Sequence, residues 1–441
     1  MSDAAPDFSS PPVATELVGN GLMIDGRWDW LEHIYDYEPG GHHPVHLGDL
    51  LYERYKVIHK LGHGGFANIW LCRDSKSDTF KYYAVKIMMS KDSERDSSEA
   101  VRVRKMMDLG FGKQFPAEYL ALPLDHFEIK GPNGTHSVFV YPVLGPRVSG
   151  LSSLEVPKTD SELRKVCFQV TQAMATLHAH GVCHGDFRPA NILACILNLD
   201  GLPEEDLFEL VGAPQTANVV LPSGGQHLVT TAPQYLVYPI KWEHVADDHP
   251  ELILPKACVI DFGQSFDVGA PREDLGIPQP YRAPECSLER QVGPGCDLWA
   301  LGCTLYEIRT GKRLFQPFGD ELDELLYQAA LIFGKLPEPW WSDTWESRRE
   351  VFQDEVDEDG MVVEVDDDIE GIDEPRSLQE RLRKEFFIEP QSGTSGVKRY
   401  FPEDEIELFA DLLQGLLRWD PKDRRTASEA LEHAYFKQFA S

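Results

Sequence analysis

The sequence predicts an α+β protein of two lobes, a β-rich first lobe with one main helix and a mainly helical second lobe. From Tyr55 to about residue 145, short runs rich in β-branched and aromatic residues alternate with Gly, Asp, Ser or Asn. After Pro146, apolar residues recur at three- and four-residue spacing, as in "DSELRKVCFQVTQAMATLHAHG". The period of the apolar pattern therefore changes once along the chain, which indicates two lobes of different secondary structure.

The composition along the chain suggests the boundaries. Residues 1–40, rich in Pro, Ser and acidic side chains, are expected to form a disordered tail, followed by a first lobe over 41–145 and a second over 146–440. The main helix of the first lobe is expected at about 93–109. Insertions are expected at about 196–255 and 350–376. The second contains twelve carboxylates and no Lys or Arg within 354–374, which predicts a solvated, unstructured loop.

The charge limits the partners. The chain has 441 residues, with 42 basic against 73 acidic side chains, a net charge of −31. This balance argues against direct binding to nucleic acid and favours a cationic substrate. No apolar run reaches membrane-spanning length, so no membrane partner is expected. Eight scattered cysteines without a CxxC pair predict reduced thiols in the cytoplasm or the nucleus. We expect a monomer.

A Gly-rich stretch, "KLGHGGFANIWL", lies between two predicted strands. Gly62, Gly64 and Ala67 follow the GxGxxG spacing, with Ile69 after them. Such glycines let backbone amides approach phosphate oxygens closely. A dinucleotide-binding fold would place a helix after the glycines, whereas here a second strand comes next. The stretch therefore predicts a phosphate-covering hairpin, although the third Gly is missing.

A lysine and a glutamate are expected to follow this hairpin. Seventeen positions after Ile69, "YYAVK" places Lys86 in a strand, where it would anchor nucleotide phosphates. On the next helix Glu99, Val103 and Met106 share one face, so Glu99 could turn inward and hold Lys86. A solvent-facing Glu99 is the alternative.

Two further motifs carry phosphoryl-transfer chemistry. In "HGDFRPAN", Asp186 would orient the attacking hydroxyl, Arg188 would neutralise phosphoryl charge, and Asn191 would bind Mg²⁺. His184 is interpreted as a packed scaffold residue. The strand "KACVI" then ends at Asp261, a second Mg²⁺ ligand.

The order Gly-rich loop, AxK, HxDxxxxN, DFG is typical of protein kinases, but kinases of small molecules share much of it. The residues beyond the DFG motif distinguish the two classes. "YRAPE" closes an activation segment at Glu285, "CDLWALGCTLYEI" contains Asp297 in a helix that would support the catalytic loop, and Arg424 is the expected partner of Glu285. These features favour a protein substrate.

The sequence resembles the SR-protein-specific kinases, Ser/Thr kinases of Arg/Ser-rich splicing factors, and is most similar to fungal members. The resemblance covers about 37–440 and is most specific in the lead-in "YEPGGHHPVHLGD", in "GPNGTHSVFVYPVLG" and in "CHGDFRPANIL". It implies that Tyr141 is the gatekeeper and that residues 142–144 form the hinge. The implied ATP-binding residues are Gly62, His63, Gly64, Gly65, Ala67, Ile69, Ala84, Lys86, Tyr141, Val143 and Leu144. Phe262 and Gly263 would complete the DFG motif after Asp261.

The sequence departs from the family's pattern at the helix Glu and in the residues that regulate the activation segment. The family's spacing puts the helix Glu at Val101, whereas periodicity favours Glu99. Gly185 replaces the Arg that grips a phosphorylated loop in many kinases. Between Asp261 and Glu285 the only hydroxyls are those of Ser265 and Tyr281. These last two features predict that loop phosphorylation is not the switch.

Substrate contacts differ as well. Pro278 stands where the family usually has a Thr near the end of the activation segment. That Thr helps to define Ser and Thr as the acceptor residues. Acidic residues at 320–324 could dock a basic peptide or only favour a helix N-terminus, and Leu331 stands where a further acid is expected.

The function predicted from the sequence is Mg-ATP-dependent transfer of a phosphoryl group to Ser or Thr of basic, Arg/Ser-rich proteins, with ATP and Mg²⁺ as cofactors. Two alternatives remain open at this point. A pseudokinase or ATP-binding scaffold is favoured by the missing third Gly and the uncertain helix Glu, and a small-molecule kinase by "HGD".

Overall fold

A computed structural model describes residues 21–93, 99–111, 118–148, 160–317, 321–365, 377–384, 386–388 and 397–439. The described residues form two compact units. The first unit is drawn from 1–101, 122–144 and 196–245, and the second from 102–121, 145–195 and 246–441.

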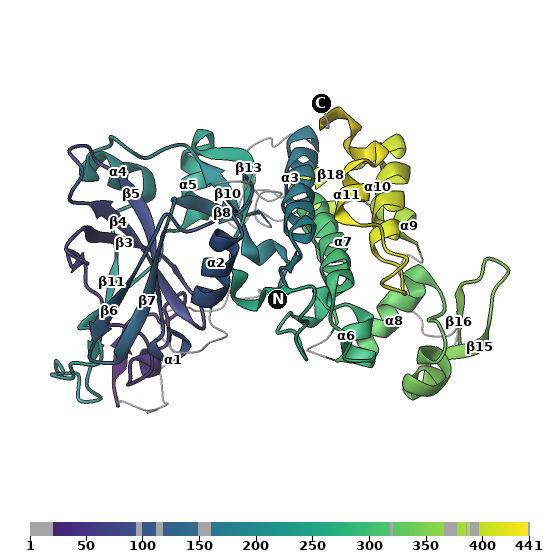
Figure 1. The fold of residues 1–441 in the computed structure, drawn as a ribbon, viewed down its shortest axis with the longest axis horizontal. Coiled ribbons are helices and arrows are strands. Elements are labelled where there is room, and N and C mark those ends of the chain that lie inside the picture. Colours follow the sequence, from purple (N-terminus) through teal and green to yellow (C-terminus); the bar gives the residue numbers. More distant parts are fainter. Residues whose placement is uncertain are drawn as a thin grey trace, which may run out of the picture. The chain divides into compact units, whose positions relative to one another are not determined.

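The first unit is built on a six-stranded antiparallel sheet, in which β3, β4, β5 and β7 lie side by side (Figure 1). Its strands, in spatial order, are β2 (Leu50–Leu51), β3 (Tyr55–His63), β4 (Ala67–Asp74), β5 (Tyr82–Met88), β7 (Gly134–Tyr141) and β6 (Asp125–Gly131). Alternate residues such as Val57, Trp70, Val85 and Val138 pack into one core on one face of this sheet. The predicted β-rich first lobe is therefore present.

The family's lead-in runs along this sheet. Gly41 accepts a hydrogen bond from the amide of Ser90 (3.0 Å), and the Asn133 amide group donates to the His42 carbonyl (2.6 Å). A Cβ on Gly41 would lie 1.8 Å from the Asp36 carbonyl oxygen, so this position requires glycine. Two short helices follow β5, α1 (Ser90–Ser93) and α2 (Glu99–Asp108).

The prediction of a disordered tail over 1–40 is wrong for residues 21–40; residues 1–20 lie outside the described part. Strand β1 (Met23–Asp25) pairs with β11 (Thr216–Val220), which pairs with β12 (Tyr235–Val237). Leu31 and Tyr37 are buried with Ala217 and Leu236. The predicted insertion thus packs against the N-terminal segment, and both belong to the first unit together with α4 (Glu204–Val211).

The second unit is mainly helical, as predicted. Its helices are α3 (Asp160–Ala179), α6 (Pro284–Leu288), α7 (Pro294–Thr310), α8 (Leu322–Phe333), α9 (Leu378–Arg383), α10 (Glu403–Leu416) and α11 (Ala427–Leu431). Helix α5 (Trp242–Asp248) contains the point in the sequence at which the first unit ends and the second begins. One small sheet consists of β13 (Ile253–Val259), β10 (Ile192–Ile196) and β8 (Leu144–Arg147), in that order. Two further pairs of strands are β14 (Phe266–Asp267) with β9 (Val182–Cys183) and β17 (Phe386–Ile388) with β18 (Val397–Arg399). Helix α7 is buried all round and packs against α3 and α10. Among the described residues, no helix is long and apolar enough to cross a bilayer.

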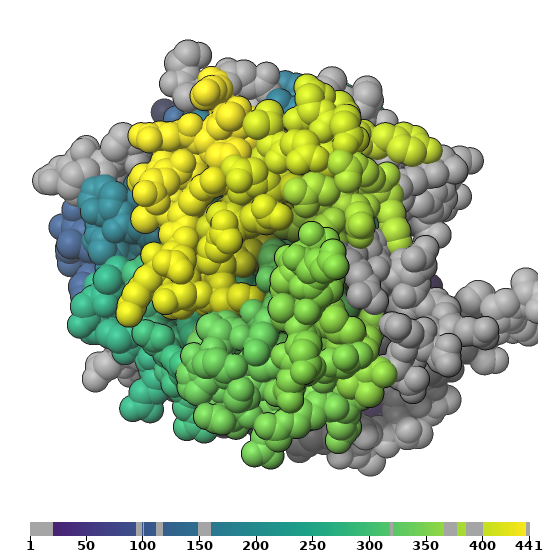
Figure 2. All heavy atoms as spheres, turned by 90° about the vertical axis from the view of Figure 1, so that its right-hand side faces the viewer, coloured from purple at the N-terminus to yellow at the C-terminus, as the bar shows by residue number. Residues whose placement is uncertain are grey.

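The acidic run also differs from its prediction. Its described part forms a hairpin of β15 (Phe352–Val356) and β16 (Val362–Glu364). The hairpin is anchored because Phe352 and Val362 are buried against Trp341 and Trp345. The carboxylates of residues 354–359 are exposed, whereas Glu364 is half-buried and accepts the Tyr327 hydroxyl (2.6 Å). Residues 366–376 lie outside the described part. In Figure 2, this region (green) adjoins the C-terminal helices (yellow) on the surface.

Candidate active site

The Gly-rich stretch forms the hairpin between β3 and β4. The Gly64 amide donates to the Ala67 carbonyl (2.9 Å), and Gly62 lies opposite Ile69. A Cβ placed on Gly62, Gly64 or Gly65 would meet no protein atom within 4 Å. The hairpin backbone therefore has open space beside it, as close approach of a phosphate requires. Ala67 already lies in β4 and is buried, so the missing third Gly does not disturb the turn.

Lys86 projects from β5 and pairs with Glu99 at the start of α2. The Lys86 Nζ lies 2.5 Å from the Glu99 Oε2, and both side chains are largely buried. Val103 and Met106, on the same helix face as Glu99, are buried too, whereas Val101 is 44% exposed. Helical periodicity therefore identified the partner of Lys86, and the family's spacing did not.

The hinge residues follow β7. Tyr141, at the end of β7, lies opposite Ala84 on β5, and Val143 and Leu144 are half-buried just beyond it. Together with the hairpin and Lys86, they place all the predicted ATP-binding residues in the first unit.

The catalytic loop lies in the second unit. Asp186 accepts hydrogen bonds from the Arg188 Nε (2.9 Å) and from the Asn191 Nδ2 (2.7 Å). Burial raises the pKa of Asp186, and the Arg188 guanidinium opposes this shift. The loop thus brings together the three predicted residues and fixes the rotamer of the carboxylate.

Asp297, at the start of α7, is hydrogen-bonded to the backbone of the catalytic loop. Its carboxylate accepts the amides of His184 (2.7 Å) and Gly185 (2.9 Å), and a bond from the His178 Nε2 (3.1 Å). Burial would raise the pKa of Asp297, but the bond from His178 and the adjacent charges lower it overall. The carboxylate therefore stays ionised as a fixed acceptor for the loop backbone.

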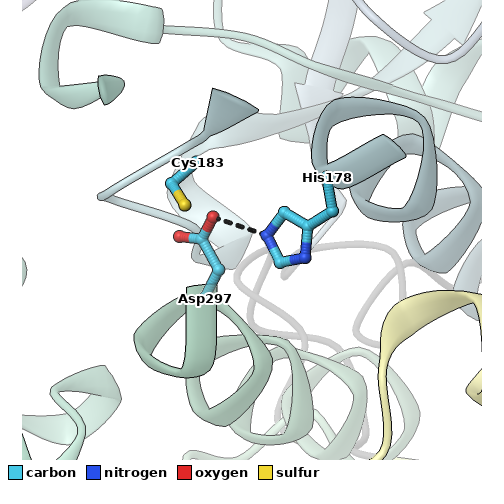
Figure 3. A group of neighbouring side chains, drawn as sticks. All are labelled: His178, Cys183 and Asp297. Atoms are coloured by element: carbon cyan, nitrogen blue, oxygen red, sulfur yellow. Dashed lines mark hydrogen bonds and ion pairs between the residues drawn. The ribbon is translucent and has the colours of Figure 1, made fainter. Parts of the chain in front are cut away.

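Three side chains below this loop, His178, Cys183 and Asp297, could in principle hold a metal ion, because their ligating atoms lie within 4.8 Å of one another (Figure 3). Both Asp297 oxygens already accept hydrogen bonds from the loop. Burial raises the pKa of the Cys183 thiol, which opposes formation of the thiolate that a metal needs. We assign the group to loop support. Sequence reasoning did not find His178, which no motif marks.

Gly185 has a steric reason. Its φ is +78°, and a Cβ there would lie 2.5 Å from the backbone oxygen of Gln264. An Arg at this position is incompatible with the observed loop, so the departure from the Arg of many kinases is built into the backbone.

The DFG motif continues from β13. Asp261 adopts a left-handed conformation (φ 63°), and its carboxylate accepts the Gly263 amide (3.3 Å). Phe262 is buried, with its ring centroid 5.4 Å from that of His184. Within the same unit, the Arg102 guanidinium on α2 donates to the Gly263 carbonyl (2.5 Å). Arg102 is a further residue that the sequence motifs did not indicate.

Both hydroxyls of the activation segment are engaged. The Ser265 Oγ donates to the Phe262 carbonyl (2.7 Å), and the Tyr281 hydroxyl donates to Glu307 (2.6 Å). Both residues are buried. In this conformation neither hydroxyl is exposed for phosphorylation.

The end of the segment is fixed by Glu285 and Arg424. The guanidinium donates to both carboxylate oxygens, at 2.6 and 2.8 Å, and both side chains are buried. The structure therefore brings these two predicted residues together. In α8, Leu331 is buried in the core, and Asp320 lies outside the described residues.

Comparison with known proteins identifies the class. The model of the protein kinase domain matches residues 55–197 and 252–436, so the chain belongs to the protein kinase family. The unmatched stretch, 198–251, coincides with the insertion predicted at about 196–255. This match excludes the small-molecule kinase alternative.

Individual relatives indicate which kind of protein kinase the chain resembles. The chain is 27% identical to "Serine/threonine-protein kinase SRPK" of Physarum polycephalum, over 94% of this chain and 93% of the relative. It is 26% identical to "Serine/threonine-protein kinase AFC3" of Arabidopsis thaliana, over 99% and 94%. "Protein kinase dsk1" of Schizosaccharomyces pombe is 30% identical, over 42% and 34%. The predicted resemblance to SR-protein kinases is confirmed, and the chain is a serine/threonine protein kinase of this type.

Proposed function

We propose that the chain binds Mg-ATP and transfers its γ-phosphoryl group to Ser or Thr of basic, Arg/Ser-rich proteins, without phosphorylation of its own activation segment. The observation that carries this proposal is the catalytic loop, in which Asp186 is oriented by Arg188 and Asn191 while Asp297 holds the backbone. Phosphoryl transfer requires a carboxylate held in this way, whereas the scaffold alternative gives no reason for it.

The residues present suit the cofactors. The open space beside Gly62, Gly64 and Gly65 suits the phosphates, and Lys86, held by Glu99, would contact them. Asn191 and Asp261 supply the oxygen ligands that Mg²⁺ prefers. The ion would neutralise phosphate charge. Asp186 would orient the substrate hydroxyl and accept its proton, while Arg188 would stabilise charge on the transferring group.

Regulation without loop phosphorylation is supported by two independent features. The backbone at Gly185 leaves no room for a phosphate-gripping Arg, and the hydroxyls of Ser265 and Tyr281 are buried in hydrogen bonds. The Lys86–Glu99 pair removes one of the two arguments for the scaffold alternative. A monomeric state and a location in the cytoplasm or the nucleus stay predictions.

A basic substrate is supported by the surface of the second unit. Glu321, Asp323 and Glu324 lie at the N-terminal end of α8, and the exposed carboxylates of the β15–β16 hairpin add to the negative charge. These groups attract cationic peptides over distances of about a Debye length, roughly 8–10 Å at physiological salt.

Substrate preference can be measured with three matched peptides: an Arg-Ser repeat and versions with every Arg replaced by Lys or by Gln. We expect kcat/KM for the Arg peptide to exceed that for the Gln peptide at least tenfold, about 1.4 kcal/mol. The ratio should fall as salt is raised. Equal kcat/KM values for the Arg and Gln peptides would contradict the proposed substrate class.

A further inference from the structure

A buried ion pair lies at the base of the Gly-rich hairpin. Lys60, two residues before Gly62, has a fully buried side chain, and its ammonium pairs with the carboxylate of Glu32, which is 2% exposed. Tyr37 donates its hydroxyl to the Glu32 Oε1 (2.7 Å), and the Asn68 amide group donates to the Tyr37 oxygen (3.2 Å). The network thus joins the N-terminal segment to both strands of the hairpin.

The register between β3 and β4 shifts at this location. Lys60 lies opposite Trp70 and Gly62 lies opposite Ile69, so β3 has one extra residue there, Leu61. Such a bulge twists and re-aims the strand that carries it. The conformation at Lys60 therefore sets the direction in which the glycines project.

The backbone at this point is held as well. The Lys60 carbonyl accepts the amide of Ile240 from the insertion (2.9 Å), and the Lys60 amide donates to the His59 Nδ1 (2.8 Å). The ring of His63, inside the hairpin, is hydrogen-bonded to the Trp30 carbonyl (3.1 Å). The N-terminal segment and the insertion, which share their own apolar core, converge on the hairpin base.

A buried ion pair is a poor way to gain stability alone. Desolvation of two charges offsets much of their attraction, and apolar residues of similar size often stabilise a core equally well. What the pair adds over an apolar contact is direction, because the ammonium must stay beside the carboxylate. This favours a positioning role.

We propose that Glu32 is a positioning residue for ATP: through Lys60 it fixes the bulge at the base of the Gly-rich hairpin and thereby the hairpin's approach to the nucleotide phosphates. This inference rests on the ATP binding proposed above. It assigns a function to the segment 22–37, which no kinase motif covers.

The first test is Glu32→Gln, with Asp74→Asn as the matched control. Asp74 lies at the other end of β4, is buried, and pairs with Arg54 at 2.8 Å. For Glu32→Gln we expect the KM for ATP to rise about 10- to 100-fold, with a much smaller change in kcat. In the nucleotide-free protein, amides 61–69 should exchange hydrogen faster. Asp74→Asn should lower thermal stability without either change.

A second variant separates direction from stability. Glu32→Leu combined with Lys60→Met removes both charges and should recover most of the stability lost in Glu32→Gln. We expect its KM for ATP and its exchange at 61–69 to stay raised. Return of both quantities to wild-type values would overturn the proposal, because the pair would then be purely structural.

Hydrogen exchange also separates this inference from the proposed function, since it needs no ATP. Faster exchange at 61–69 in Glu32→Gln supports the positioning of the hairpin even if the wild-type chain transferred no phosphate. Unchanged exchange in a folded Glu32→Gln protein overturns it, whatever the activity. If Glu32→Gln does not fold, Tyr37→Phe removes the hydroxyl that donates to Glu32 and accepts from Asn68. It should show the same changes to a smaller extent, and its failure to do so overturns the proposal equally.

Discussion

Replacing Asp186 by Asn is expected to lower kcat for phosphoryl transfer by about 10²- to 10⁴-fold, the usual contribution of a positioned proton acceptor. The amide is nearly the same size as the carboxylate, but it cannot accept the proton of the substrate hydroxyl. Binding of ATP should change little, because the predicted nucleotide contacts are made by other residues. Single-turnover transfer to an Arg-Ser peptide measures the effect.

The control for this variant is Asp423→Asn, which makes the same chemical change at an exposed position. It should retain wild-type transfer. Thermal unfolding should show that both variants are folded. A loss of less than tenfold in Asp186→Asn would show that Asp186 does not have the proposed role.

Replacing Arg424 by Leu is expected to have the largest effect on stability. Glu285 would be left buried without its bidentate partner, and breaking such a pair from one side costs about 3–5 kcal/mol of unfolding free energy. The arginine also lies 5.1 Å from the ring of Trp299 and donates to the Gly295 carbonyl (2.8 Å). Urea denaturation at fixed pH measures the loss.

The neighbouring residue provides a matched control. Arg425 pairs with Asp411 at 3.0 Å, but both side chains are partly exposed to solvent. Arg425→Leu should therefore cost no more than about 1 kcal/mol. Equal losses for the two variants would mean that burial of the Glu285–Arg424 pair is not what stabilises this end of the segment.

The chemistry of the site could be predicted because phosphoryl transfer constrains residue type and spacing over short stretches. Asp186, Arg188 and Asn191 lie within six residues, so the sequence alone brings them near one another. Glu99 is more instructive. Its helix face follows from a local period, whereas the family's spacing points to Val101, whose side chain is exposed.

The parts that were mispredicted depend on contacts distant in sequence. Residues 23–25 are a strand only because 218–220 lie beside them, and no local pattern reveals this pairing. In the same way, charge suggested that 354–364 would be unstructured, but Phe352 and Val362 anchor this stretch to a cluster of tryptophans. The pairing of Lys60 with Glu32 was also hidden, since a lysine in a strand usually faces solvent.

We propose that this chain is an active kinase without a phosphorylated activation segment. The most direct measurement is the time course of transfer to an Arg-Ser peptide by protein treated with phosphatase and shown by mass spectrometry to carry no phosphate. We expect a linear time course from the first turnover, at a rate that later autophosphorylation does not change. An inactive protein that gains activity only after phosphorylation of Ser265 or Tyr281 would contradict it.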